Sequence, residues 1–121
     1  MRMSDVKPSA EFCSLSINAS VANLTLERSD VYNALNAQLI SEIIDILDWT
    51  THRSVGRTGS LRDHDDAEYL RVLVLRGAGR HFCAGADINM MRDAGVKTPE
   101  ENRTDSERLD RLFNTLWAHP C

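Results

Sequence analysis

The chain has 121 residues, of which 42% are hydrophobic, 26% charged and 6% aromatic, a composition typical of a single soluble globular domain. Collagen, coiled coil and full-length disorder are therefore excluded. Fourteen Lys and Arg against eighteen Asp and Glu leave a net charge of −4. Positive charge is not concentrated anywhere along the chain, so nucleic acid is not an expected partner.

Membrane and metal sites are also not expected from the sequence. No apolar run approaches the roughly 18 residues that a membrane helix needs, and the first ten residues lack the apolar core of a secretory signal. We therefore expect a cytoplasmic protein. The cysteines form neither a CxxC pair nor a cluster of zinc spacing, and we expect all three to be small buried hydrophobes: Cys13, Cys83 and Cys121.

The first predicted elements are a β-hairpin and an amphipathic helix. Residues 1–11 are expected to be a flexible N-terminus, and alternating runs at 12–17 and 21–26 predict the two strands. A helix should begin after Asn36, which can cap it, with its apolar side chains on one face: Leu39, Ile40, Ile43, Ile46 and Leu47. The opposite face should carry the polar side chains: Ser41, Glu42, Asp45 and Asp48.

The second half of the chain predicts a loop, a strand and two more helices. Residues 50–68 are polar and glycine-containing, which indicates a surface loop inserted into the domain. The run Tyr69–Leu75 is typical of a strand buried on both faces. One helix is predicted from Ala86 to Ala94. The next begins with a capping box at Thr98 and Glu101, and its apolar stripe comprises Leu109, Leu112, Phe113, Leu116 and Trp117.

The glycine-rich stretch from Gly77 to Met91 follows the predicted buried strand and is the segment most suited to chemistry. A dinucleotide fingerprint would need glycine at Phe82, and no Walker A lysine is present. A nucleophile elbow would need a serine, but only Cys83 is available, without a paired base. These three interpretations therefore fail.

The remaining interpretation is that the main chain of this stretch, rather than its side chains, binds a ligand. Gly85 permits a tight turn, the small side chains of Ala84 and Ala86 permit close approach of a ligand, and a helix beginning here would leave its first amides unpaired. Such amides can stabilise an oxygen that becomes negative during a reaction. The simpler alternative is that the segment is only a turn before a helix, and Asp87 is more easily explained as a helix cap than as a catalytic acid.

The stretch GRHFCAGADINMM resembles the first signature of the crotonase family, also called the enoyl-CoA hydratase/isomerase family. The upstream segment RSDVYNALN, residues 28–36, resembles that family's R-P-x-x-x-N-A-L segment. This resemblance implies an α/β fold, the N-terminal part of a crotonase-like spiral of ββα units, with a partial and incomplete domain over residues 12–121.

The resemblance also implies a site for an acyl-CoA substrate, with no separate cofactor. The backbone N–H of Ala86 would donate to the thioester oxygen in an oxyanion hole. The positions expected to border coenzyme A are Val31, Ala84, Gly85, Ala86, Asp87, Ile88 and Asn89. At Asp30 the family often has a lysine that contacts CoA phosphates, a role that an acidic residue cannot fill.

A finer similarity, carried by GADINMM and TPEEN, is to the methylglutaconyl-CoA hydratase branch, which acts in leucine breakdown. Family members are longer and carry their catalytic glutamates downstream. We therefore expect an N-terminal fragment with negligible turnover alone, from a full-length homotrimer or hexamer. The alternatives are an isomerase or thioester hydrolase of the same family, or a non-catalytic remnant that binds CoA or a partner.

Overall fold

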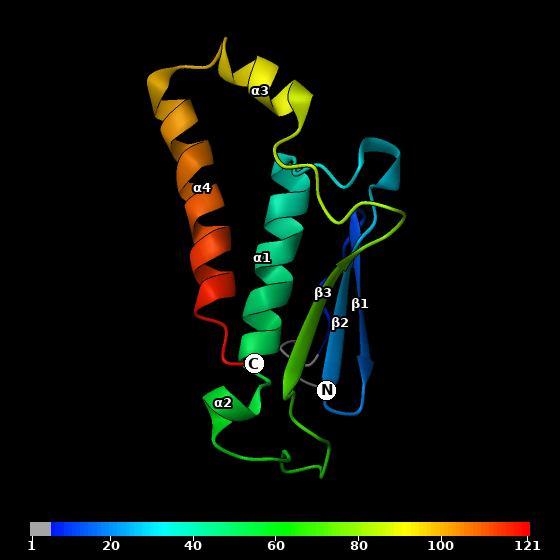
Figure 1. The fold of residues 1–121 in the computed structure, drawn as a ribbon. Coiled ribbons are helices and arrows are strands. Elements are labelled where there is room, and N and C mark those ends of the chain that lie inside the picture. Colours follow the sequence, from blue (N-terminus) through cyan, green and yellow to red (C-terminus); the bar gives the residue numbers. More distant parts are fainter. Residues whose placement is uncertain (1–5) are drawn as a thin grey trace.

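The computed structural model describes residues 6–121 and shows a three-stranded sheet covered on one side by helices (Figure 1). Strands β1 (Cys13–Asn18) and β2 (Val21–Leu26) form an antiparallel hairpin, as predicted. Strand β3 (Val72–Gly77) pairs with β2 in parallel, giving the order β1-β2-β3. The predicted flexibility of residues 1–11 lies partly outside the described residues. Within them, the backbone N–H of Glu11 donates to Glu42.

Within residues 6–121 four α-helices complete the fold, and two of them form layers beside the sheet. Helix α1 (Ala37–Thr51) lies against the sheet, and α4 (Pro99–Trp117) packs on the other side of α1 (Figure 1). The shorter helices are α2 (Val55–Thr58) and α3 (Ile88–Ala94). Two predicted caps are confirmed: Asn36 accepts from the Leu39 N–H, and Thr98 and Glu101 form the capping box. None of the helices within residues 6–121 has both the length and the apolar character needed to cross a membrane.

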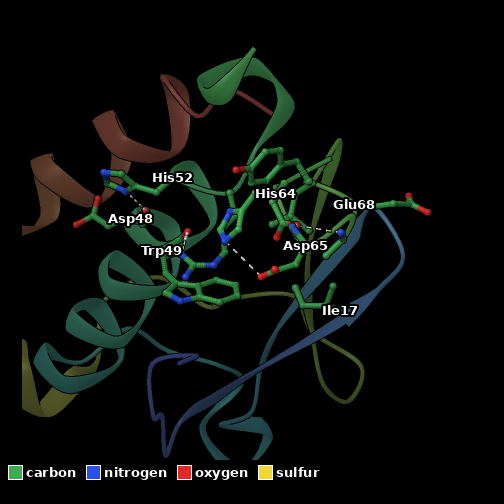
Figure 2. Close-up of a pocket in the computed structure, with 12 residues that line it drawn as sticks. Ile17, Asp48, Trp49, His52, His64, Asp65 and Glu68 are labelled. Atoms are coloured by element: carbon green, nitrogen blue, oxygen red, sulfur yellow. Dashed lines mark hydrogen bonds and ion pairs between the residues drawn. The ribbon is translucent and has the colours of Figure 1, made fainter. Parts of the chain in front are cut away.

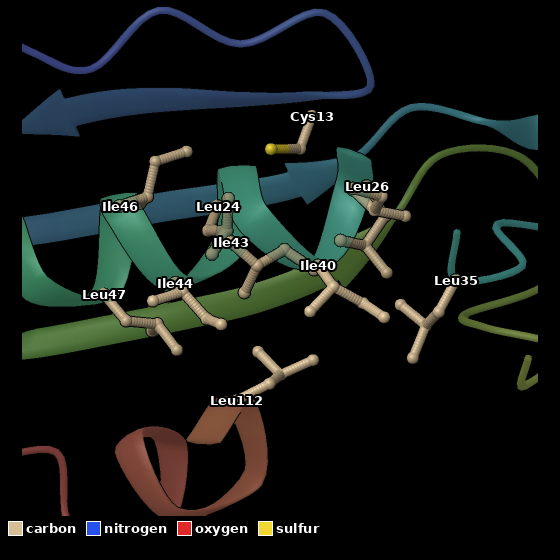
Figure 3. Close-up of a cluster of buried hydrophobic side chains, with 11 residues drawn as sticks. Cys13, Leu24, Leu26, Leu35, Ile40, Ile43, Ile44, Ile46, Leu47 and Leu112 are labelled. Atoms are coloured by element: carbon tan, nitrogen blue, oxygen red, sulfur yellow. The ribbon is translucent and has the colours of Figure 1, made fainter. Parts of the chain in front are cut away.

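The hydrophobic core lies between the sheet and α1, and one residue of α4 closes it (Figure 3). The predicted face of α1 is buried, because its apolar residues recur at helical spacing and meet Leu24 and Leu26 of β2. The buried cluster comprises Cys13, Leu24, Leu26, Leu35, Leu39, Ile40, Ile43, Ile44, Ile46, Leu47 and Leu112.

The outward orientation predicted for Glu42 is wrong. This residue is only 9% exposed, and its carboxylate accepts hydrogen bonds from the backbone N–H groups of Glu11 and Phe12 and from the Gln38 side chain. Burial alone would raise the pKa of Glu42, but these hydrogen bonds stabilise the carboxylate and lower its pKa below the ordinary value. The glutamate thus fixes the start of β1 to α1.

The strand predicted to be buried on both faces is instead an edge strand. It begins three residues later than predicted, and its residues alternate between exposed and half-buried, with Val72 47% and Val74 37% exposed. Its inner residues Leu73 and Leu75 pack against the core. The run of apolar residues does form a strand, but within residues 6–121 its second face is exposed.

Three other predictions need correction. The stretch 50–68 is not a plain loop, because α1 continues to Thr51 and α2 follows it. The stripe on α4 is divided, since Leu112 is buried but Phe113 and Trp117 are 53% and 92% exposed. Among the cysteines only Cys13 is buried, and Cys121 is exposed. Burial raises the pKa of the Cys13 thiol to about 12, with the nearby Glu42 carboxylate acting in the same direction, so this thiol is unreactive.

Candidate functional site

Two loops meet at the end of the sheet where β2 and β3 finish. One loop, residues 27–36, follows β2, and the other, residues 78–87, follows β3. Because β2 and β3 are parallel, their carboxyl ends lie at the same edge, and the loops that follow them are brought together there. Residues that are some fifty positions apart in the sequence therefore form one junction.

Asn33 is the buried link between the two loops. Its side chain is fully buried and donates to the carbonyl oxygens of Ala78 at 2.9 Å and His81 at 2.8 Å. Its Oδ1 accepts from the backbone N–H of Arg28 at 2.8 Å. Both Tyr32 and Asn33 have a left-handed backbone, with φ of 56° and 58°. Such a conformation costs about 1 kcal/mol or more for a non-glycine residue, and here the three hydrogen bonds of Asn33 offset it.

Arg28 and Asp87 form a second link across the junction. The Arg28 guanidinium contacts the Asp87 carboxylate at 3.2 Å, donates to the carbonyl of Ala34, and lies 5.1 Å from the centre of the Phe12 ring. The other oxygen of Asp87 accepts from the N–H groups of Asn89 and Met90, which confirms the predicted cap of α3. Burial alone would raise the pKa of Asp87, but these hydrogen bonds and the Arg28 charge lower it, so the group stays ionised.

The backbone of Ala86 is positioned by a short parallel bridge to Leu35. The Leu35 N–H donates to the Gly85 carbonyl at 2.7 Å, and the Asp87 N–H donates to the Leu35 carbonyl at 2.8 Å. In a parallel bridge of this register, the N–H of the central residue points away from the partner strand. Within residues 6–121, the Ala86 N–H accordingly has no hydrogen-bond acceptor, whereas the N–H groups of Ala84 and Asp87 are both used.

The physical origin of this open N–H differs from the predicted one. The sequence predicts a helix start at Ala86, but α3 begins at Ile88, and the Asp87 side chain accepts from the N–H groups of Asn89 and Met90. The open amide instead comes from the bridge and from Gly85, whose φ of 95° turns the chain. A β-carbon at Gly85 would meet no atom within 4 Å, so conformation rather than space calls for glycine here.

The other candidate residues lie around the same junction. Val31 ends a short 3₁₀ helix (Ser29–Val31) and is half-buried, and Ala84 is exposed with its N–H bonded to Tyr32. Ile88 is 63% exposed, and Asn89 is exposed. The structure therefore brings the predicted residues to one region. It adds two that sequence reasoning left without a role, Arg28 and Asn33, although both stand in the segment RSDVYNALN that carried the family resemblance.

The surface around the junction contains a small hollow. It has a volume of about 300 Å³, and its lining includes Arg28, Asn36, Asp87, Asn89 and Met90. No group of three or more His, Cys, Asp or Glu side chains within residues 6–121 is arranged to hold a metal ion. The chemistry available at this junction is thus hydrogen bonding from main-chain amides beside an ionised, fully bonded carboxylate.

Comparison with known proteins identifies the family. The family model for enoyl-CoA hydratase/isomerase matches residues 16–119. The chain belongs to the enoyl-CoA hydratase/isomerase family. It is similar to an enoyl-CoA hydratase/isomerase family protein of Bacillus subtilis, with 31% identity over 89% of this chain and 33% of the relative. It is also similar to an enoyl-CoA hydratase of Rhodobacter capsulatus, with 36% identity over 86% of this chain and 33% of the relative.

The fold comparison supports the same assignment. The crystal structure of an enoyl-CoA hydratase from Shewanella pealeana superposes with a TM-score of 0.73 and 29% identity, over 96% of this chain and 39% of that one. The predicted α/β class and crotonase-like architecture are confirmed. The chain spans about one third of the length of the curated relatives that it matches.

Proposed function

We propose that this chain supplies the first part of an acyl-CoA thioester site, in which the backbone N–H of Ala86 donates to the thioester carbonyl oxygen. The observation that carries the proposal is the open N–H of Ala86 within residues 6–121, on a backbone that the Leu35 bridge holds in place. The proposed CoA contacts are the residues that surround it: Val31, Ala84, Gly85, Asp87, Ile88 and Asn89.

The chemistry that an N–H provides at this position is electrostatic. When a nucleophile adds to an enoyl thioester, negative charge accumulates on the carbonyl oxygen as an enolate forms. A fixed donor stabilises that charge more in the transition state than in the ground state, and the loss of one such donor costs about 2.7–4 kcal/mol. Ala86 is suited to this because the Leu35 bridge fixes its backbone before the ligand binds.

Proton transfer needs a different group. Asp87 is the carboxylate next to Ala86, but its oxygens are bonded to Arg28, Asn89 and Met90, and its pKa is lowered. An acid that is already ionised and fully bonded is a poor proton donor. We therefore assign to residues 84–89 the binding and polarisation of the thioester, and we expect the acid and base to come from another part of the whole protein.

The proposed reaction of the whole protein is hydration of an enoyl-CoA. The similarity of GADINMM and TPEEN to the methylglutaconyl-CoA hydratase branch favours methylglutaconyl-CoA as the substrate and leucine breakdown as the setting. The family description joins hydratases with isomerases, so an enoyl-CoA isomerase is the second candidate. On the family resemblance we propose that the full-length form assembles as a homotrimer or hexamer, and we propose the cytoplasm as its compartment.

The thioester contact can be tested by NMR on the chain labelled with ¹⁵N. We expect crotonyl-CoA to shift the Ala86 amide proton downfield, because a new hydrogen bond forms there. Coenzyme A without an acyl group should leave this resonance nearly unchanged. The Ala84 amide, which already donates to Tyr32, is the internal control. If crotonyl-CoA and coenzyme A affect the Ala86 amide equally, the oxyanion role is wrong.

A pair of substitutions separates the amide from its side chain. Proline at position 86 removes an N–H that no bond within residues 6–121 uses, so the Leu35 bridge can persist. We expect Ala86→Pro to abolish the preference for crotonyl-CoA over coenzyme A. Ala86→Gly, which keeps the N–H, should retain that preference. Equal preference in the two variants would contradict the proposal.

A further inference from the structure

The ion pair of the loop junction is buried, unlike charged contacts elsewhere on the molecule. The side chains of Arg28 and Asp87 are only 13% and 10% exposed. At a hollow of about 820 Å³ near the C-terminal end of α1, His64 and Asp65 are in contact at 3.4 Å but stay 71% and 79% exposed (Figure 2). Because water and salt compete for exposed charges, the buried pair is the one of these two that can hold a fixed arrangement.

The Arg28 guanidinium reaches both sides of the Leu35 bridge. Its Nη1 donates to the carbonyl of Ala34, the residue before Leu35. Its Nη2 donates to Asp87, the residue after Ala86, with 3.2 Å between Nη2 and the carboxylate Oδ2. The bridge itself consists of the two backbone hydrogen bonds of Leu35. One side chain thus spans the bridge that directs the Ala86 N–H.

Arg28 is held at both its backbone and its side chain. Its N–H donates to the Asn33 side chain and its carbonyl accepts from the Asn33 N–H, both at 2.8 Å. Its guanidinium lies 5.1 Å from the centre of the Phe12 ring, which packs against the hydrophobic core. The arginine is therefore in place before any ligand binds.

The two contacts of Arg28 need the shape of a guanidinium as well as its charge. This group is planar and presents several N–H donors in fixed directions, whereas a lysine ammonium is a single point of charge on a flexible stem. Hydrogen bonds with a charged partner are roughly twice as strong as neutral ones. Since both Nη atoms are already bonded, Arg28 acts through Ala34 and Asp87 rather than on a ligand.

We propose that Arg28 is a positioning residue that holds Ala34 and Asp87 on either side of the Leu35 bridge, so that the Ala86 N–H faces the thioester oxygen. This inference rests on the proposed function of Ala86. Without the guanidinium, only the two neutral hydrogen bonds of the bridge fix this backbone, and the N–H changes direction more freely. A hydrogen bond weakens steeply as its angle departs from linear, so the thioester contact is weakened within the folded molecule.

Backbone ¹⁵N relaxation of the ligand-free 121-residue chain tests the effect on the bridge. In Arg28→Gln we expect the order parameter of Ala86 to fall from about 0.85 toward about 0.6, while that of Ile44 in α1 stays near 0.85. Arg92→Gln removes the same charge from an exposed position of α3 and should change neither. An unchanged Ala86 order parameter in Arg28→Gln would overturn the positioning role.

Saturation with crotonyl-CoA tests the effect on the thioester contact. In Arg28→Gln the downfield shift of the Ala86 amide proton at saturation should be reduced by about half or more. A residue that only stabilises the fold would leave this shift unchanged in the molecules that are folded. Arg92→Gln should keep the full shift, which controls for the attraction of any cation to the CoA phosphates.

A lysine variant separates the charge of Arg28 from its two-sided contact. Arg28→Lys keeps the charge but not the two fixed donors, so we expect a saturated shift between those of Arg28→Gln and the wild type. It also supplies the comparison with the wild type where Arg28→Gln does not fold. A full shift in Arg28→Lys would contradict the two-sided contact.

The wild type distinguishes this inference from the function on which it rests. If its Ala86 amide does not respond to crotonyl-CoA, the proposed function is wrong and the positioning role falls with it. If the wild type responds and Arg28→Gln responds equally, the positioning role alone is wrong.

Discussion

The loop junction at the N-terminal end of α1 and the exposed turn of residues 61–68 near the C-terminal end of this helix use polar residues in opposite ways. At its N-terminal end, Asn33, Arg28 and Asp87 are largely withdrawn from water. Asn33 donates to the backbone of the facing loop, and Arg28 and Asp87 pair with each other across the junction. At its C-terminal end, Arg62, Asp66 and Glu68 are paired mainly with one another and stay exposed. Buried polar groups specify one arrangement because any other leaves them unbonded, whereas exposed pairs can exchange their partner for water.

The largest effect should come from Asn33. We expect Asn33→Ala to lower the free energy of unfolding by roughly 3 kcal/mol or more, because it removes three hydrogen bonds and leaves alanine in a left-handed backbone. Urea unfolding at pH 7 measures this. Asn114→Ala, on the exposed side of α4, should have almost no effect. If both variants lose a similar free energy of unfolding, Asn33 does not specify the junction more strongly than an exposed polar residue does.

Asp87 should come second and should depend on pH. Replacement by asparagine keeps a side-chain acceptor for the α3 cap but removes the charge that pairs with Arg28, and we expect a loss of about 2 kcal/mol at pH 7. The folded pKa of Asp87 lies below its unfolded value near 3.9. Its contribution is therefore fully present above the unfolded pKa and disappears as the pH falls through the folded pKa.

Urea unfolding of the wild type and Asp87→Asn between pH 2 and pH 7 checks this dependence. The difference between them should be constant above about pH 5 and should shrink in acid. Asp93→Asn, on the exposed surface of the same helix, is the matched control. A difference that stays constant down to pH 2 would show that the charge of Asp87 does not stabilise the junction.

The third prediction compares two glycines with similar backbones at the two ends. Gly85 and Gly59 have φ of 95° and 72°, and a β-carbon would meet no atom within 4 Å at either position. Alanine should cost about 1 kcal/mol at each, through strain alone. We expect only Gly85→Ala to weaken crotonyl-CoA binding in a titration. A comparable loss in Gly59→Ala would place the ligand elsewhere.

The smallest effect should come from Arg62. Its side chain is half exposed and pairs with Asp66 and Glu68 at 3.9 and 3.7 Å. Arg62→Ala should change the free energy of unfolding by at most about 0.5 kcal/mol, and the change should decrease further in 1 M NaCl. Thermal melts at low and high salt are sufficient. A loss above about 2 kcal/mol in the free energy of unfolding would show that the Arg62 ion pairs stabilise the fold as much as the Asn33 junction does.

Sequence patterns predicted a structural feature correctly where that feature depends only on residues of the same segment. The hairpin, the apolar face of α1, the Asn36 cap and the Thr98 capping box follow from neighbouring residues, and all are confirmed. The predictions for Glu42, the β3 faces and the α4 stripe were wrong because each depends on a distant segment. Glu42 looks solvent-facing in its own helix and becomes buried only because residues 11 and 12 lie over it.

For the candidate site, too, some features follow from the sequence and others only from the tertiary structure. The sequence by itself determined the family, through the AGAD motif and the upstream RSDVYNALN segment, and it determined where glycine and small residues stand. Only the tertiary structure decided that the Ala86 N–H is open, because this depends on the register of the Leu35 bridge between two loops. Motifs and periodicity are properties of neighbouring residues, whereas hydrogen-bond direction across a junction is set by how parallel strands bring distant residues together.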